Sequence, residues 1–195
     1  DERYRRSAEF LTVLRGALGS TSFDFDGDFY RVEAATTRHS PVESPPIFFG
    51  GASDAAEAVA ATHVDTYLLW GEPPDAAGER LERMRERAAA TTRDTGRELE
   101  FGIRFHVITR DTADEAWAEA ARLLRGMDPD AVAAARADFA APASVGQRRM
   151  ADLHAEVDGV PEDPRDLEIS PNLWAGVGLV RGGAGTVLVG SHSEV

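Results

Sequence analysis

The sequence predicts an α/β protein built from parallel strands that alternate with amphipathic helices. Three strand-like segments, each an apolar run bounded by glycine, proline or charged residues, are each followed by a helical segment rich in alanine or in apolar residues at helical spacing. Such alternation is typical of a parallel sheet that helices cover on at least one face. The three pairs are Pro46–Gly50 with Asp54–Thr62, Asp65–Trp70 with Ala76–Thr91, and Phe101–Thr109 with Ala113–Arg125.

A helix and a hairpin are predicted ahead of these pairs. Apolar residues recur at helical spacing from Phe10 to Leu18, and Gly19 follows as a stop. Asp26-Gly27 then lies between two phenylalanine-containing segments, and this dipeptide tolerates the positive φ angles of tight hairpin turns.

The third pair carries a local helix-start signal, and the pattern weakens after it. Thr112 and Glu115 have the spacing of a capping box, in which each side chain accepts a hydrogen bond from an amide at the helix start. The weaker region contains a predicted alanine-rich helix at Asp130–Phe139, a further candidate helix at Ser144–His154 and a polar loop at Asp158–Asp166.

The composition of the chain argues against several classes of partner and ligand. The net charge of −13 argues against nucleic acid and anionic membranes as partners, because both need a concentrated basic surface. No apolar run approaches the ~20 residues that span a bilayer, so we expect a cytoplasmic protein. The chain has no cysteine, which excludes disulfides and thiolate ligands, and its histidines lack ligand spacing, so no metal is predicted.

The run Ser170–Gly190 contains six glycines, and its one charged residue is Arg181. Glycine is dense where a segment moves or where its backbone approaches a ligand closely. A guanidinium binds a sulfonate or phosphate in a bidentate manner, so this run predicts a mobile loop that grips an anion. The alternative is a glycine-rich surface loop.

Arg104 and His106 lie two positions apart on one predicted strand and therefore project to the same side, with Ile103, Phe105 and Val107 on the other. An inward-facing arginine and histidine are costly to bury unless they bind an anion or titrate near neutrality. They are candidate catalytic residues, and the alternative is a purely structural pair.

Gly50, Gly51, Ala52 and Ser53 form a turn between a strand and a helix. Free amides, the positive end of the helix dipole and the serine hydroxyl could converge there on a phosphate. The alternative is that Ser53 only caps its helix. Trp70 ends the next strand, where it either packs in the core or lines a cofactor pocket.

Several segments together resemble the flavin-dependent alkanesulfonate monooxygenases of the bacterial-luciferase-like superfamily. The matching segments follow the family's order at roughly its spacing and cover most of the chain. They are PPIFFGGASDAAEAVAATHVDTYLLWGEPP, FGIRFHVITRDTADEAW, SVGQRRM and the glycine-rich run with the preceding LEIS.

The resemblance implies part of a luciferase-like TIM (β/α)₈ barrel, incomplete in this chain because the N-terminal and C-terminal barrel strands are missing. Only two or three barrel strands are evident, whereas the fold needs eight in about 250 residues. We therefore expect residues 1–195 to form a single domain that is an internal segment of a barrel. A β-hairpin insertion is expected near 22–34 and a loop or helical insertion near 127–185.

The resemblance also implies the chemistry. Such an enzyme oxidises an alkanesulfonate with O₂ and reduced FMN (FMNH₂), which a separate NAD(P)H-dependent flavin reductase supplies, and releases an aldehyde and sulfite. Arg104, His106 and Arg181 would be catalytic, and Gly50, Gly51, Ala52, Ser53 and Trp70 would bind FMN. A homo-oligomer is expected.

Two alternatives stay open. The protein could be another luciferase-like oxidoreductase that uses FMN or the deazaflavin F420, because fold does not fix the substrate or the flavin. It could also be a catalytically silent half-barrel that self-associates through exposed sheet edges.

Overall fold

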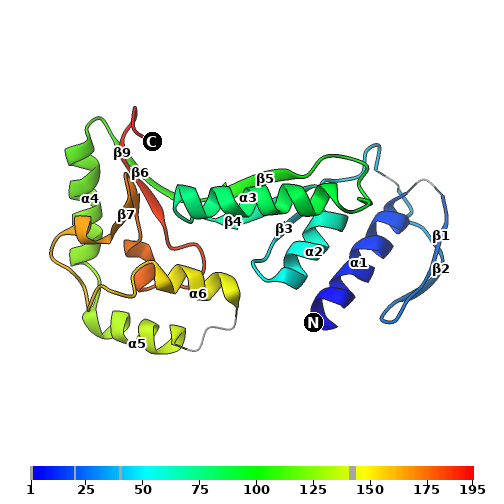
Figure 1. Ribbon diagram of the computed structural model, residues 1–195, viewed down its shortest axis with the longest axis horizontal. Helices are drawn as coiled ribbons and strands as arrows, with labels where there is room; N and C mark the ends of the chain where they lie inside the picture. The colour runs from blue at the N-terminus through cyan, green and yellow to red at the C-terminus, as the bar shows by residue number, and fades with distance from the viewer. Residues whose placement is uncertain (1, 20, 40, 141–143) are drawn as a thin grey trace. The chain divides into compact units, whose positions relative to one another are not determined.

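Helices and strands alternate along the chain in the computed structural model, which describes residues 2–19, 21–39, 41–140 and 144–195 (Figure 1). The α/β class is confirmed, and the described strands form separate sheets rather than a closed barrel. Two compact units are present: unit 1 comprises residues 1–68 and 81–102, and unit 2 comprises 69–80 and 103–195. The single domain stays a prediction.

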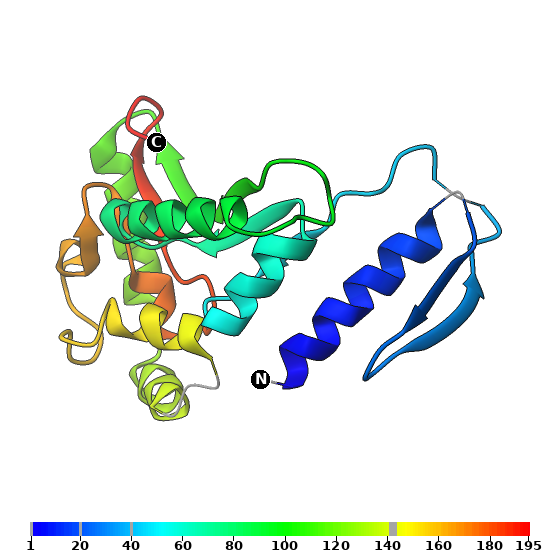
Figure 2. The same ribbon diagram turned by 45° about the vertical axis from the view of Figure 1, so that its right-hand side comes forward.

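Unit 1 begins with α1 (Glu2–Leu18), which packs between α2 (Asp54–His63) and a hairpin in both Figure 1 and Figure 2. The hairpin consists of β1 (Phe23–Asp26) and β2 (Arg31–Ala35), which pair antiparallel. The helix and the hairpin that the sequence predicts are therefore both confirmed.

The reason given for the hairpin turn is wrong. Gly27 does not adopt a positive φ angle. A side chain at Gly27 would instead meet the carboxylate of Glu9 and the ring of Phe25, each 2.5 Å from an added Cβ. The Glu9 carboxylate accepts hydrogen bonds from the amides of Asp28, Phe29 and Tyr30 at 2.8–3.1 Å, so α1 holds the turn in place.

A parallel sheet follows, with the order β3-β4-β5. Its strands are β3 (Phe48–Gly50), β4 (Thr66–Trp70) and β5 (Glu100–Arg104). The helix α3 (Pro74–Ala89) supplies Met84, which is fully buried with Tyr67 of β4 and Ala56 of α2. The apolar strands and alanine-rich helices that the sequence predicts form this core.

Unit 2 contains a four-stranded sheet with the order β6-β9-β8-β7. In this sheet β6 and β9 are parallel, and the other pairs are antiparallel. The strands are β6 (His106–Arg110), β7 (Glu168–Ser170), β8 (Leu173–Trp174) and β9 (Val187–Ser191). The helices are α4 (Ala113–Arg125), α5 (Pro129–Phe139), α6 (Val145–Asp152) and the 3₁₀ helices η1 (Pro164–Leu167) and η2 (Gly176–Leu179).

The core of unit 2 lies between α4 and the sheet. Trp117 of α4 packs with Trp174 of β8, which is completely buried. The capping box at the start of α4 is confirmed, since the Thr112 side chain and the Glu115 side chain each accept a hydrogen bond from the other residue's amide. The structure also corrects the expectation of a loop over the glycine-rich run at 170–190, because much of this run is strand or 3₁₀ helix.

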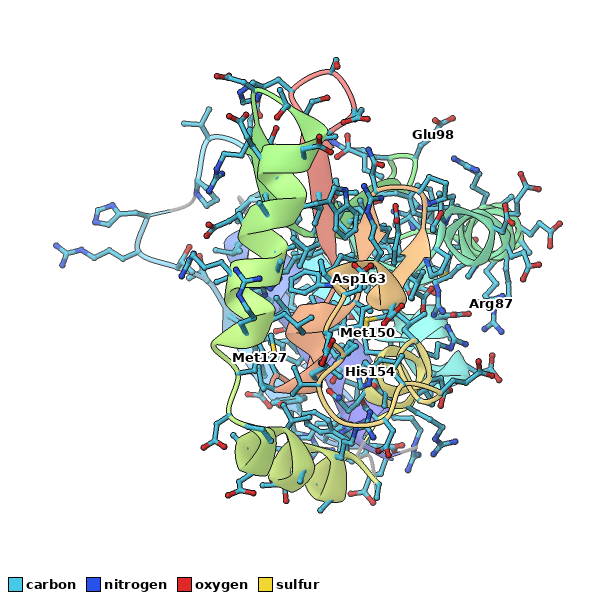
Figure 3. The ribbon with its side chains drawn as sticks, turned by 90° about the vertical axis from the view of Figure 1, so that its left-hand side faces the viewer. Arg87, Glu98, Met127, Met150, His154 and Asp163 are labelled. Atoms are coloured by element: carbon cyan, nitrogen blue, oxygen red, sulfur yellow. The ribbon has the colours of Figure 1, made fainter. Side chains whose placement is uncertain are left out.

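The turn that follows α6 carries a buried histidine. His154, labelled with Met150 of α6 in Figure 3, is only 6% exposed. Burial lowers the pKa of His154 below its ordinary value, and the positive charge of Arg136 lowers it further. The ring lies against Gly178 of η2, where an added Cβ would be 3.0 Å from its Cδ2 atom. Protonation of His154 is therefore disfavoured in this buried position against η2.

Candidate functional site

The strand expected at Phe101–Thr109 is two strands, and this is a correction to the sequence prediction. β5 ends at Arg104, β6 begins at His106, and Phe105 belongs to neither. The backbone changes partners here, because the Arg104 carbonyl accepts from the Gly71 amide at 3.1 Å while the His106 amide donates to the Thr186 carbonyl at 3.0 Å. Hydrophobic alternation does not record such an exchange of neighbours.

The interruption also changes which residues face the helix. Ile108 of β6 belongs to the core under α4, together with Val187 and Val189 of β9. Val107, which we expected on the helix-facing side, is 56% exposed. His106 shares its side of β6 with Ile108, so the expected common face of Arg104 and His106 does not follow from continuous alternation across Phe105.

The structure brings His106 and Arg181 together although they are 75 residues apart. The Nε2 atom of His106 lies 3.3 Å from Nη1 of Arg181 and 3.1 Å from the carbonyl oxygen of Ala184. Nε2 can accept from the guanidinium only as a bare nitrogen, and it can donate to the carbonyl only when protonated. The position of one proton therefore decides whether the imidazole bonds to Arg181 or to the loop backbone.

The side chain of Arg104 is exposed, and within the described residues its guanidinium makes no hydrogen bond or ion pair. Its backbone carbonyl accepts the hydrogen bond from the Gly71 amide, whereas its guanidinium is available to a ligand. The structure thus joins two of the three predicted catalytic residues, His106 and Arg181, by direct contact.

The glycine-rich segment around Arg181 is held at several points. The amide of Gly183 donates to Oε1 of Gln147 at 2.7 Å, and the amide of Gly178 donates to the carbonyl of Gly185 at 3.0 Å. Gly183 has a φ of +89°, a conformation that strongly favours glycine. Glycine is also needed at Gly185, because an added Cβ would lie 2.5 Å from the Cα of Gly178.

Trp70 lies against the same segment and against the first turn of α6. A Cβ added at Gly146 would be 3.1 Å from Cζ3 of Trp70, and one added at Gly183 would be 3.8 Å from its Cζ2. The ring is half-buried, so one part of it packs while the remainder is accessible. Trp70 therefore belongs to the surroundings of the Arg181 loop.

Sequence reasoning assigned no role to Glu72 as an ion-pair partner, and it missed Gln147. Glu72 accepts two hydrogen bonds from the buried guanidinium of Arg80, at 2.8 and 3.1 Å, and Nη1 of Arg149 lies 3.7 Å from its Oε1. The sequence signals for this region were the candidate helix at Ser144–His154 and the family-like segment SVGQRRM, which contains both Gln147 and Arg149. No spacing rule connects these residues to Glu72 or to the loop.

The predicted phosphate turn, Gly50–Ser53, lies in unit 1. Ser53 caps α2, because its Oγ accepts from the amide of Ala56 at 3.3 Å. The amides of Gly51, Ala52 and Ser53 have no hydrogen-bond partner in the described part of the chain. Two acidic residues of the first turn, Asp54 and Glu57, are paired with Arg87 and Arg83, which reduces their repulsion of an anion.

Residues 2–19, 21–39, 41–140 and 144–195 contain no group of three or more histidine, aspartate or glutamate side chains that could hold a metal ion. Over the same residues, no helix has the length and apolar character required to cross a membrane.

Comparisons with known proteins place this geometry in context. The sequence model of a family described as luciferase-like monooxygenase matches residues 1–195. Riboflavin lyase RcaE, solved with a modified FMN and riboflavin, covers 100% of this chain at 19% identity with a TM-score of 0.65, and 48% of that structure is matched. DmoA from Hyphomicrobium sulfonivorans covers 100% at 21% identity with a TM-score of 0.66, and 47% of it is matched.

A third structure, the long-chain alkane monooxygenase LadA, covers 80% of this chain at 17% identity with a TM-score of 0.61, and 44% of it is matched. The chain therefore spans less than half the length of these structures. At such identities the likeness shows the fold.

Proposed function

We propose, since this chain belongs to the luciferase-like monooxygenase family, that it is part of a flavin-dependent monooxygenase that cleaves alkanesulfonates. The reaction converts an alkanesulfonate, O₂ and reduced FMN into an aldehyde, sulfite, oxidised FMN and water. The observation that carries the proposal is the contact between His106 of β6 and Arg181 of the glycine-rich loop.

Arg181 has the chemistry of a sulfonate clamp. Its guanidinium offers paired N–H donors to the sulfonate oxygens, and charge-assisted bidentate bonds of this kind are roughly twice as strong as neutral ones. Arg181 is exposed at the loop surface, and its contact to His106 is a single bond of 3.3 Å. A sulfonate can therefore replace that contact, and Arg104 supplies a second cation in the same unit.

His106 is the group that moves a proton. Because Nε2 lies between the Arg181 guanidinium and the Ala184 carbonyl, it can hold or release one proton while its ring stays in place. Binding of a sulfonate by Arg181 frees Nε2 to exchange that proton with the reacting group. The loop that bears Arg181 would also exclude water from the reaction.

Each unit contains residues whose chemistry suits one part of a flavin. The three free amides at Gly51, Ala52 and Ser53 are donors suited to the FMN phosphate, with the Ser53 hydroxyl committed to the helix cap. Trp70 exposes part of a flat aromatic surface suited to the ring system. When bound, reduced flavin supplies the activation of O₂, and a separate flavin reductase would provide it.

Sulfite release tests this proposal. The intact protein is supplied with reduced FMN, O₂ and a series of linear alkanesulfonates, and sulfite is measured by its reaction with a thiol reagent. We expect turnover, and we expect Arg181→Ala to lower kcat/KM about 10- to 100-fold, since it removes charge-assisted bonds to the substrate. Arg125→Ala, at the exposed end of α4, is the matched control and should leave turnover unchanged.

Absence of sulfite with every sulfonate tried would overturn the substrate assignment. A spectral titration with reduced FMN and with reduced F420 then identifies the flavin. Preference for F420 would place the protein among other luciferase-like oxidoreductases.

A second candidate, a catalytically silent half-barrel, is favoured by apolar side chains exposed on the strands. In unit 1, Phe48 of β3 and Leu68 of β4 are exposed, and in unit 2 so is Val107 of β6. This candidate predicts that the isolated 195-residue chain self-associates and binds no FMN. A monodisperse monomer that binds FMN in sedimentation and fluorescence titrations would eliminate it.

A further inference from the structure

The first turn of α6 connects directly to the loop that carries Arg181. Ser144 caps this helix by accepting the amide of Gln147 on its Oγ at 3.1 Å, which fixes the backbone from which the Gln147 side chain extends. Oε1 of Gln147 then accepts the amide of Gly183 at 2.7 Å. The same oxygen would lie 3.1 Å from a Cβ at Gly182, so the loop backbone packs closely on the Gln147 amide.

Side chains from two different elements thus contact two adjacent residues of the loop. Gln147 of α6 holds the amide of Gly183, and His106 of β6 faces the carbonyl of Ala184. The His106 bond depends on the tautomer of its ring, whereas the Gln147 bond does not, because the amide oxygen accepts in every protonation state. When His106 turns its Nε2 lone pair to Arg181, the Gln147 bond is the one of these two that remains.

The Arg181 side chain is exposed, so the position of its backbone decides where the guanidinium can reach. Arg181 lies two residues before Gly183, and the intervening Gly182 and the left-handed Gly183 restrain little by themselves. Without an external anchor at Gly183, this stretch gains backbone freedom and the guanidinium loses its position next to His106.

We propose that Gln147 is a positioning residue that anchors the Arg181 loop, so that the loop opens when the bond from Gln147 to Gly183 breaks. The anchoring follows from the contacts above, and its kinetic consequence rests on the proposed function.

Limited trypsin digestion tests the anchoring without any substrate. Trypsin cleaves after Arg181 when the loop opens, and mass spectrometry identifies that cut. Gln147→Met keeps a side chain of similar length but has no comparable acceptor, and we expect it to be cut after Arg181 about 5- to 10-fold faster than the wild type. Gln147→Glu keeps an acceptor oxygen, and we expect it to be cut at close to the wild-type rate.

Cleavage after Arg122, inside α4, is the internal control, because it reports opening of the unit 2 core rather than of the loop. It should be equal in all three proteins. If Gln147→Met is cut after Arg181 no faster than the wild type, or if Gln147→Glu is cut as fast as Gln147→Met, the anchoring proposal is wrong.

Kinetics of the intact enzyme test the consequence. Gln147→Met should raise KM for the sulfonate several-fold with a smaller change in kcat, since the clamp residue is present but less often in place, and Gln147→Glu should restore KM. A wild-type protein without sulfonate activity would overturn the proposed function and leave the digestion result intact. An active enzyme whose KM is unchanged in Gln147→Met would overturn the positioning role.

Discussion

Replacing Glu72 by glutamine should be among the most destabilising isosteric changes in unit 2. Glu72 is 8% exposed and its partner Arg80 is 5% exposed, and two hydrogen bonds of 2.8 and 3.1 Å join the two side chains. Arg149 adds a second guanidinium 3.7 Å from the same carboxylate, and its Nη1 is buried without a hydrogen bond. Two guanidinium groups therefore approach the carboxylate of Glu72 in a poorly hydrated place.

Glu72→Gln keeps the size of the side chain and removes the charge. The cost comes from the buried Arg80 guanidinium, which loses the charge of this carboxylate, and removal of one partner of a buried pair costs about 3–5 kcal/mol. The two short bonds and the low exposure of both side chains place this pair within that class. The second guanidinium acts in the same direction.

Urea denaturation followed by tryptophan fluorescence measures the loss as a change in the free energy of unfolding. Glu119→Gln is the matched control, because Glu119 makes an equally short bidentate contact to Arg122 on the exposed surface of α4. Exposed pairs contribute little, so this variant should unfold like the wild type. Equal stability of Glu72→Gln and Glu119→Gln would refute the reasoning.

Other changes probe the packing and the titration of unit 2. The pKa of His154 is below its usual 6.5 in the folded protein, so the unfolded chain binds the proton first and stability should fall as pH drops below about 6.5; urea titrations at pH 5.5 and 7.5 should show a smaller difference for His154→Gln than for the wild type. Gly71→Ala should lower stability by about 1–3 kcal/mol in thermal melts, since its Cβ would lie 2.3 Å from the Phe105 ring and from Oγ1 of Thr186. Gly78→Ala, in α3 with open space around it, should instead raise stability by about 0.5–1 kcal/mol, and a loss there would contradict the helix-propensity argument.

Elements that depend on near neighbours in the chain could be predicted. The capping box of Thr112 and Glu115 and the strand–turn–helix at Gly50–Ser53 rest on residues within a few positions of one another. The hairpin was also predicted from its local apolar pattern, although Glu9 of α1 holds its turn. Their signals are hydrophobic periodicity, capping side chains and turn residues, which are local properties.

The candidate site could be predicted in part. Arg181 was identified by its isolation among glycines and His106 by its place in an apolar segment, and the structure joins them. The break at Phe105 could not be predicted, because the apolar pattern runs through it unchanged while the hydrogen-bonding neighbour changes from the segment after β4 to the segment before β9.

The sequence by itself determined the α/β class, the order of helices and strands, and the residues with the chemistry to bind an anion. Only the tertiary structure decided that Gln147 holds Gly183, that Glu72 faces Arg80 and Arg149, and that Arg181 reaches His106. The physical reason is the separation along the sequence between the residues that make each contact. Periodicity and capping arise between residues a few positions apart, whereas most of these contacts join segments 36 to 77 positions apart, whose approach depends on the packing of the whole unit.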